Sequence, residues 1–328
     1  MTVHDMPLQS QTQVQEKPKL HVAASFFSII LGLCGLGQAW RVAAHLWGMP
    51  PVVGECILLT AALIWAGLLA AYILQSCRDP ARSIQEFRHP VLGGTVALLG
   101  ISTLLMVVAV LPYSLLLAWI LAAAGIAWHL AFSLWHTGTM WQGSRNPLDS
   151  VPTLYLPTVA GNFTSAAALG ALGQPDFGWL FLGAGVFSWL ALEPLIFQRL
   201  WHGEGLPVQQ RALLGIQFAP PAVCAMAWLL LAPGSADHWL LMLWGYGLFQ
   251  LLLGLRLKPW LGAQPFSHSY WSYTFGIAST TICALKLALA GVGSAKILAI
   301  PIFAGANLVI GGFFIRTVYA AWRWRRTE

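Results

Sequence analysis

The chain has 328 residues, of which 58% are hydrophobic and only 9% are charged, and its formal net charge is +6. Soluble domains carry about 25% charged residues, so this composition excludes an ordinary soluble domain and predicts an integral membrane protein. In such a protein the positive charge is expected on cytoplasmic loops rather than on a nucleic-acid surface. The five cysteines form no CxxC pair, so the sequence predicts no metal or redox motif.

The chain begins with a polar, Gln-rich stretch over residues 1–21, which we predict to be a disordered cytoplasmic tail. Lys17 and Lys19 precede a long apolar run, an arrangement that imitates a signal peptide. The run is longer than the usual h-region of about 7–15 residues, so we expect an uncleaved first span.

Membrane-spanning helices need about 20 predominantly apolar residues, and windows of that length predict ten spans. They are 22–44, 53–76, 91–110, 114–136, 152–173, 178–199, 212–232, 237–256, 269–290 and 296–320. The expected fold is an all-α integral membrane protein with a transmembrane domain over 22–320. Residues 321–328 are expected to form a basic cytoplasmic tail.

The predicted loops alternate in charge. Connections after odd-numbered spans are short and nearly uncharged, whereas those after even-numbered spans carry Arg and Lys. Together with the two tails, they place 14 of the 17 Lys and Arg residues on one side; the exceptions are Arg41, Lys286 and Lys296. The positive-inside rule then puts both termini in the cytoplasm, and the alternation divides the chain into five helical hairpins.

Small residues, prolines and hydroxyls concentrate in the odd-numbered spans, as in "SFFSIILGLCGLG" over 25–37. Close helix packing explains any one such segment. Repetition across five hairpins favours five inner helices around a common axis, because irregular backbone at membrane depth needs burial in protein or a water-lined path. The even-numbered spans would form an outer ring against lipid.

Ionisable side chains within the spans are few. Glu193 is a functional candidate by default, but Arg199 or a backbone donor could instead pair with it. Lys286 could extend to the interface or add positive potential at an outer mouth. His129 and His136 share a helix face, which would suit haem ligation or a proton relay. Haem ligation would need histidines on a facing helix, and the other spans offer little beyond the interfacial His45 and His89. We therefore expect neither an enzyme nor a cofactor.

The odd-numbered spans carry almost no charge, whereas carriers that couple transport to protons or sodium depend on buried charge. Apolar, hydroxyl and glycine surfaces suit passive movement of easily dehydrated anions, with a steric or hydrophobic gate.

Six stretches resemble a known family. They are "RHPVL" at 88–92, "LYLPTVAGNF" at 154–163, "FLGAGVFSWLALEPLIFQRL" at 181–200, "LGIQFAPPAV" at 214–223, "WGYGLFQLLLGLRLKPW" at 244–260 and "YWSYTFG" at 270–276. Through them, residues 22–320 resemble the family of the tellurite-resistance protein TehA and the slow anion channels, which also contains dicarboxylate transporters.

The resemblance implies five hairpins with quasi-fivefold symmetry around a central pore, in each subunit of a homotrimer in the bacterial inner membrane. A phenylalanine plugs the pore in that family, and it matches Phe275; the adjacent Gly276 would leave room for the ring to swing. Ser28 stands where the family typically has glycine beside the plug. The pore-lining positions that we expect are Gly32, Gly35, Gly94, Pro157, Gly161, Gln217 and Pro220.

The predicted function is a gated channel for small inorganic or organic anions. The alternative is a proton-coupled secondary transporter that exports tellurite or C4-dicarboxylates. A carrier should depend on Glu193 or a similar acid, whereas a channel should be indifferent to it.

Overall fold

The computed structural model describes residues 22–327, so the predicted tail over 1–21 lies outside the described residues. Within 22–327 the regular secondary structure is entirely helical. The α-helices are α1 (Ser28–Trp47), α2 (Pro51–Arg78), α3 (Pro80–Arg88), α4 (Leu98–Val110), α5 (Leu115–Trp141), α6 (Gly161–Ala171), α7 (Pro175–His202), α8 (Pro220–Leu231), α9 (His238–Leu261), α10 (Thr274–Leu289) and α11 (Gly293–Thr327). The 3-10 elements are η1 (Ala24–Phe27), η2 (Gly93–Ala97), η3 (Pro147–Asp149), η4 (Pro152–Leu154), η6 (Val208–Phe218) and η7 (His268–Tyr273), and η5 (Leu156–Ala160) is a π-helix.

Nine helices in the described part of the chain are long and apolar enough to cross a membrane. The predicted span over 152–173 is not one of them, because it is divided into η4, η5 and α6. Pro157 lies in η5 and has no amide hydrogen for a regular helix. The chain is an all-helical membrane protein.

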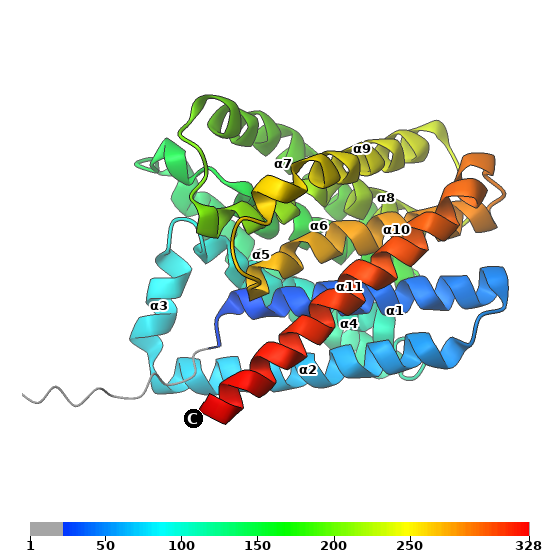
Figure 1. The fold of residues 1–328 in the computed structure, drawn as a ribbon, viewed down its shortest axis with the longest axis horizontal. Helices are drawn as coiled ribbons and strands as arrows, with labels where there is room; N and C mark the ends of the chain where they lie inside the picture. Colours follow the sequence, from blue (N-terminus) through cyan, green and yellow to red (C-terminus); the bar gives the residue numbers. More distant parts are fainter. Residues whose placement is uncertain (1–21, 328) are drawn as a thin grey trace, which may run out of the picture.

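The helices form two layers. Among the inner helices, α1 contacts α4, α4 contacts α6, α6 contacts α8, α8 contacts α10, and α10 contacts α1, which closes a ring. The outer helices α2, α5, α7, α9 and α11 each pack on the inner helix that precedes them along the chain (Figure 1). The apolar windows of four inner spans are 72–83% buried, against 17–33% for the outer ones. This contrast agrees with the predicted division into inner and outer helices.

Glycines allow the inner helices to approach one another closely. A Cβ atom on Gly32 would lie 2.4 Å from the Thr274 hydroxyl, and one on Gly35 would lie 2.4 Å from the Ala278 Cβ. Small residues at such positions let membrane helices pack with their backbones in near contact. The glycines of α1 therefore fix its distance from α10.

One end of the bundle carries the connections that enter α4, α6, α8 and α10, and we call it the basic end; the opposite end is the far end. Arginines tie these connections together. Arg145 donates a hydrogen bond of 2.5 Å to the Pro90 carbonyl, and Arg199 donates one of 2.9 Å to the Leu148 carbonyl. The short α3 lies across this end, roughly perpendicular to the other helices (Figure 1).

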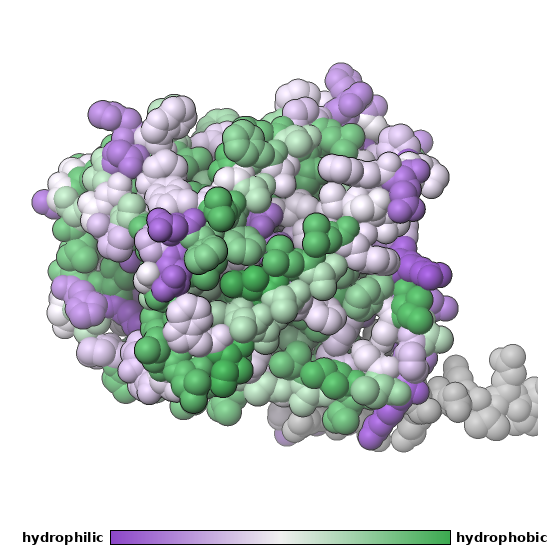
Figure 2. All heavy atoms as spheres, turned by 180° about the vertical axis from the view of Figure 1, so that it is seen from behind, coloured by the Kyte–Doolittle hydropathy of each residue, from purple (hydrophilic) through white to green (hydrophobic). Residues whose placement is uncertain are grey.

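The outer surface is largely hydrophobic. In Figure 2 green side chains fill much of the face, and hydrophilic side chains gather mainly toward its left and right ends. Outer-helix residues such as Phe187 and Leu63 are 75% and 67% exposed. A lipid environment accounts for apolar exposure on this scale. The last helix, α11, continues to Thr327, so residues 321–327 extend it.

We predict that Gly35→Leu destabilises the protein, because the new side chain would overlap α10. Overpacking a tight contact costs about 1–3 kcal/mol. The measurement is the Tm of the detergent-purified protein, which should fall by several degrees. The control is Gly67→Leu on α2, where a Cβ would meet nothing within 4 Å. Equal Tm values for the two variants would contradict the packing role.

Candidate functional site

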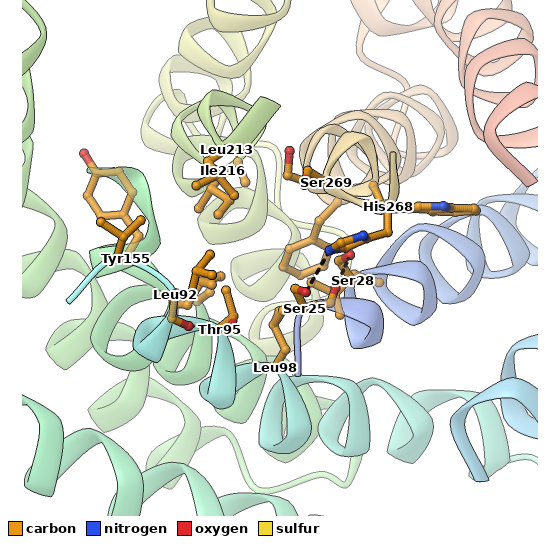
Figure 3. A pocket seen from close by; sticks show the side chains of 18 of the residues that line it. Ser25, Ser28, Leu92, Thr95, Leu98, Tyr155, Leu213, Ile216, His268 and Ser269 are labelled. Atoms are coloured by element: carbon orange, nitrogen blue, oxygen red, sulfur yellow. Dashed lines mark hydrogen bonds between the residues drawn. The ribbon is translucent and has the colours of Figure 1, made fainter. Parts of the chain in front are cut away.

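A cavity of about 440 Å³ lies inside the ring of inner helices. It reaches the surface at the basic end, where His89, Leu92 and Gln209 line it and are themselves exposed. Figure 3 shows the cavity between the first turns of several inner helices. The fold therefore positions one opening that leads from the basic end toward the middle of the bundle.

The walls of the cavity combine apolar side chains with uncharged polar groups. The side chains with hydroxyl groups are Ser25, Ser28, Thr95, Tyr155, Ser269 and Ser272. The apolar groups include Leu31, Leu98, Val159, Phe163, Ile216 and Val223. Of the described residues that line the cavity, none is Asp, Glu, Lys or Arg. Such a surface binds small ions weakly, because it offers partial charges only.

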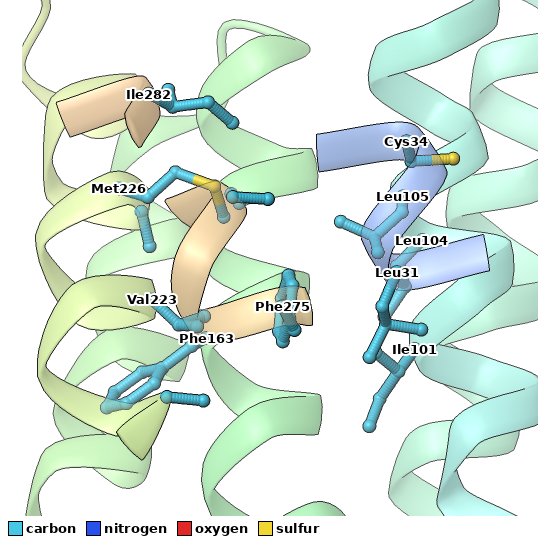
Figure 4. Close-up of a cluster of buried hydrophobic side chains, with 14 of the residues drawn as sticks. Leu31, Cys34, Ile101, Leu104, Leu105, Phe163, Val223, Met226, Phe275 and Ile282 are labelled. Carbon is cyan, nitrogen blue, oxygen red and sulfur yellow. The ribbon is translucent and has the colours of Figure 1, made fainter. Parts of the chain in front are cut away.

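Phe275 lines the cavity from the first turn of α10, and its side chain is 4% exposed. Figure 4 shows the ring near the centre of the bundle, with Phe163 and Val223 on one side and Leu31 and Ile101 on the other. Because the four neighbours come from α6, α8, α1 and α4, the Phe275 side chain lies among the other four inner helices.

The inner helices all begin at the basic end, and their first turns contribute to the cavity. The residues are Ser28 of α1, Leu98 of α4, Phe163 of α6, Pro220 of α8 and Phe275 of α10. The N-terminus of an α-helix carries a partial positive charge of about half an elementary charge, which favours anions nearby. Because 3-10 segments continue into α1, α4, α8 and α10, the positive ends of these helices lie at the starts of η1, η2, η6 and η7. Residues of these segments line the cavity, which therefore has a positive potential without a charged side chain.

The structure separates the predicted site residues into two groups. Ser28 and Pro220 line the same cavity as Phe275. The predicted glycines lie at contacts between elements instead. Gly32 and Gly35 face α10, Gly94 faces the Thr153 carbonyl, Gly161 faces His129, and Gly276 faces Phe218 and Ala219. Pro157 and Gln217 are buried beside the cavity rather than in its wall.

The Ser28 Oγ donates a hydrogen bond of 2.7 Å to the Ser25 carbonyl, so the hydroxyl proton is already used within the chain. The Gly276 position is tight as well. A Cβ there would lie 3.2 Å from the Ala219 Cα. Gly276 therefore keeps α10 close to the start of α8.

His268 is a lining residue that the sequence analysis did not select. Its Nε2 lies 3.0 Å from the Ser25 Oγ (Figure 3). Its ring stacks on Phe26 with centroids 4.5 Å apart. These contacts join η7 to η1 at the cavity mouth. His268 precedes the apolar run of the ninth predicted span, so hydropathy gave no signal that it would enter the bundle.

Glu193 of α7 takes part in a hydrogen-bonded network beside the cavity. Its carboxylate accepts hydrogen bonds from the Tyr155 hydroxyl, from Trp189 Nε1 at 2.7 Å and from the Tyr246 hydroxyl at 3.3 Å. Gln217 donates to the same Tyr155 oxygen at 3.2 Å. The predicted pairing of Glu193 is thus with aromatic donors, whereas Arg199 binds loop carbonyls.

Of the two α5 histidines, His129 connects two helices, whereas the buried Nδ1 of His136 has no hydrogen-bond partner among the described residues. His129 Nε2 lies 3.0 Å from Asn162 Oδ1, and this hydrogen bond joins α5 to α6. Among the described residues, no group of three or more His, Cys, Asp or Glu side chains is arranged to hold a metal ion.

Comparison with known proteins identifies the family of this chain. Residues 21–318 match the family described as SLAC1, voltage-dependent anion channel. The chain belongs to this family. It is 35% identical over 301 residues to the tellurite resistance protein TehA homolog of Haemophilus influenzae, a match that covers 90% of the chain and 89% of the relative. It is also similar to two Arabidopsis thaliana proteins, the S-type anion channels SLAH3 and SLAH2. The identities are 28% over 56% of the chain and 29% of SLAH3, and 27% over 87% of the chain and 56% of SLAH2.

We predict that Tyr155→Phe lowers stability, because it leaves Gln217 and Glu193 each without one hydrogen-bond partner. An unsatisfied buried polar group costs about 1–3 kcal/mol. The measurement is the Tm of the purified protein, with the exposed Tyr319→Phe as control. An unchanged Tm for Tyr155→Phe would show that this network does not hold η4 and η5 against α7.

Proposed function

We propose that this membrane protein is a gated channel that conducts small anions passively, and that the Phe275 ring is its gate. The observation that carries the proposal is the position of Phe275. Its side chain lines the cavity and lies among side chains from the other four inner helices (Figure 4). In this arrangement an ion that enters from the basic end meets the ring before it can pass farther.

The selectivity of the pathway is proposed to come from helix dipoles and dehydration. The N-termini of the inner helices favour an anion in the cavity, and the lining residues carry no fixed charge that would hold it. An ion must lose water to pass apolar walls, so the cost of dehydration decides which anion passes best. Nitrate is dehydrated more easily than chloride and should carry more current.

The wider architecture that we propose follows the sequence prediction. It has ten spans arranged as five hairpins with quasi-fivefold symmetry, of which 152–173 would be the fifth span despite its irregular backbone. Both termini would face the cytoplasm of a bacterium, because the basic connections lie at the same end as the entry to α1. A homotrimer in the inner membrane is proposed from the resemblance to the family.

A second candidate function is a proton-coupled carrier for tellurite or C4-dicarboxylates. Glu193 supports it, since the carboxylate bonds Tyr155, whose side chain lines the cavity. Tellurite resistance is also what the name of the Haemophilus influenzae relative states. The channel is favoured because Glu193 itself does not line the cavity.

We predict that Phe275→Ala produces large ohmic anion currents under voltage clamp, with little current from the wild type, first in chloride and then in nitrate. Removal of the ring would open the path that the inner helices enclose. The control is Phe187→Ala on the exposed face of α7. If Phe275→Ala conducts no better than wild type while present at the membrane, Phe275 is not the gate.

We predict that Glu193→Gln leaves anion flux through Phe275→Ala unchanged when a pH gradient is imposed across proteoliposomes. A channel needs no proton donor, whereas a carrier would lose its response to the gradient. The measurement is nitrate uptake with and without the gradient. If a pH gradient drives uptake in Phe275→Ala but not in Phe275→Ala with Glu193→Gln, the carrier is favoured.

A further inference from the structure

The inner helices contain very few charged residues. Within their bounds, α4, α6 and α8 have no Asp, Glu, Lys or Arg, α1 has Arg41, and α10 has Lys286. Arg41 is neutralised by Glu55 of α2, at 2.7 Å. The Lys286 ammonium makes no hydrogen bond or salt bridge with any other described residue. It is therefore the one unpaired charge on the inner helices as described.

Two faces of α10 are occupied by its neighbours in the ring. Thr274 and Ala278 pack against the glycines of α1. Gly276 and Cys283 face α8 instead, where the Cys283 sulfur approaches the Ala222 carbonyl at 3.6 Å. The face of α10 between these two contacts is directed toward the axis of the ring.

Phe275 and Lys286 share that face. An α-helix turns about 100° per residue, so Lys286 points within about 20° of the direction of Phe275 and lies about 16 Å farther along the axis. Ile282 lies on the same face between them (Figure 4). Lys286 is half-buried, and its place about three turns after Phe275 puts it beyond that ring, toward the far end.

Gln38 of α1 adds an unpaired donor to the same region. Its Nε2 is buried and has no hydrogen-bond partner among the described residues. Gln38 follows Leu31, a cavity-lining residue, by about two helical turns and so shares its helix face. Since Gly35 faces Ala278, Gln38 stands between the levels of Phe275 and Lys286.

The helix dipoles explain why a cation is useful here. The inner helices end at the far end, with residues such as Trp47 of α1 and Leu289 of α10. Helix C-termini carry partial negative charge, which would repel an anion at this end of the path. The Lys286 ammonium, in the last turn of α10, opposes that potential.

We propose that Lys286 and the Gln38 amide form a binding site for a small monovalent inorganic anion at the far end of the pathway. The site would concentrate anions there and lower the barrier that the helix C-termini create. This inference rests on the proposed channel function and adds to it a residue that sets conductance and its dependence on salt.

The test uses the full-length Phe275→Ala channel, with chloride as the permeant anion. Lys286→Gln in that background should reduce chloride entry from the far side about threefold to tenfold at 10 mM salt, as expected when one nearby charge is removed. The difference should vanish at 1 M salt, where the Debye length is only about 3 Å. Lys286→Arg should keep the current of the parent, and Gln38→Leu should lower it by a smaller factor.

The matched control is Lys296→Gln, which removes the same charge from an exposed position on α11. Equal currents from Lys286→Gln and the parent at low salt would overturn the inference, and so would an equal loss in Lys296→Gln. A loss in Lys286→Gln that persists at 1 M salt would also overturn it, because a structural effect is not screened. No current in the Phe275→Ala parent would instead refute the proposed channel, and the inference with it.

Discussion

Close contact between neighbouring inner helices is the constraint on which the rest of this structure depends. Each glycine at these contacts removes the side chain that would otherwise separate two backbones, as at Gly35 against Ala278. The ring can therefore close with helices alone, and its interior is left to a few larger side chains. Phe275 is one of these, and its side chain lies between those of Phe163 and Val223 on one side and Leu31 and Ile101 on the other (Figure 4).

The same ring orients the helix dipoles. All inner helices run from the basic end to the far end, so positive partial charge gathers around the cavity and negative partial charge gathers at the opposite end. A cavity that carries no charged side chain can then still favour anions. The only unpaired cation on the inner helices as described, Lys286, lies where the dipoles are unfavourable. The two ends of the pathway thus receive positive potential from different sources.

Much of the fold could be predicted from the sequence because a helix that crosses lipid needs about 20 predominantly apolar residues. Apolar segments and the alternation of basic loops are read directly, and they predicted the hairpins and the division into inner and outer helices.

The site could be predicted less well. The glycines at 32, 35, 94 and 161 were expected to line a pore, but helical periodicity does not tell which face meets a neighbour and which meets the axis. The structure places them at contacts. His268 gave no signal, because only tertiary packing brings it beside Ser25. The backbone break around Pro157 was visible as a proline, but its division into η4, η5 and α6 was not.

We propose that one path runs between the inner helices and that the Phe275 side chain closes it. The most direct measurement is the reaction of an anionic thiol reagent, added from the basic end, with Ile282→Cys in a protein without its native cysteines. Ile282 is about two turns beyond Phe275 along α10 and is 4% exposed. We expect slow reaction when Phe275 is present and much faster reaction with Phe275→Ala. Equal reaction rates in the two proteins would show that the Phe275 side chain does not block the path.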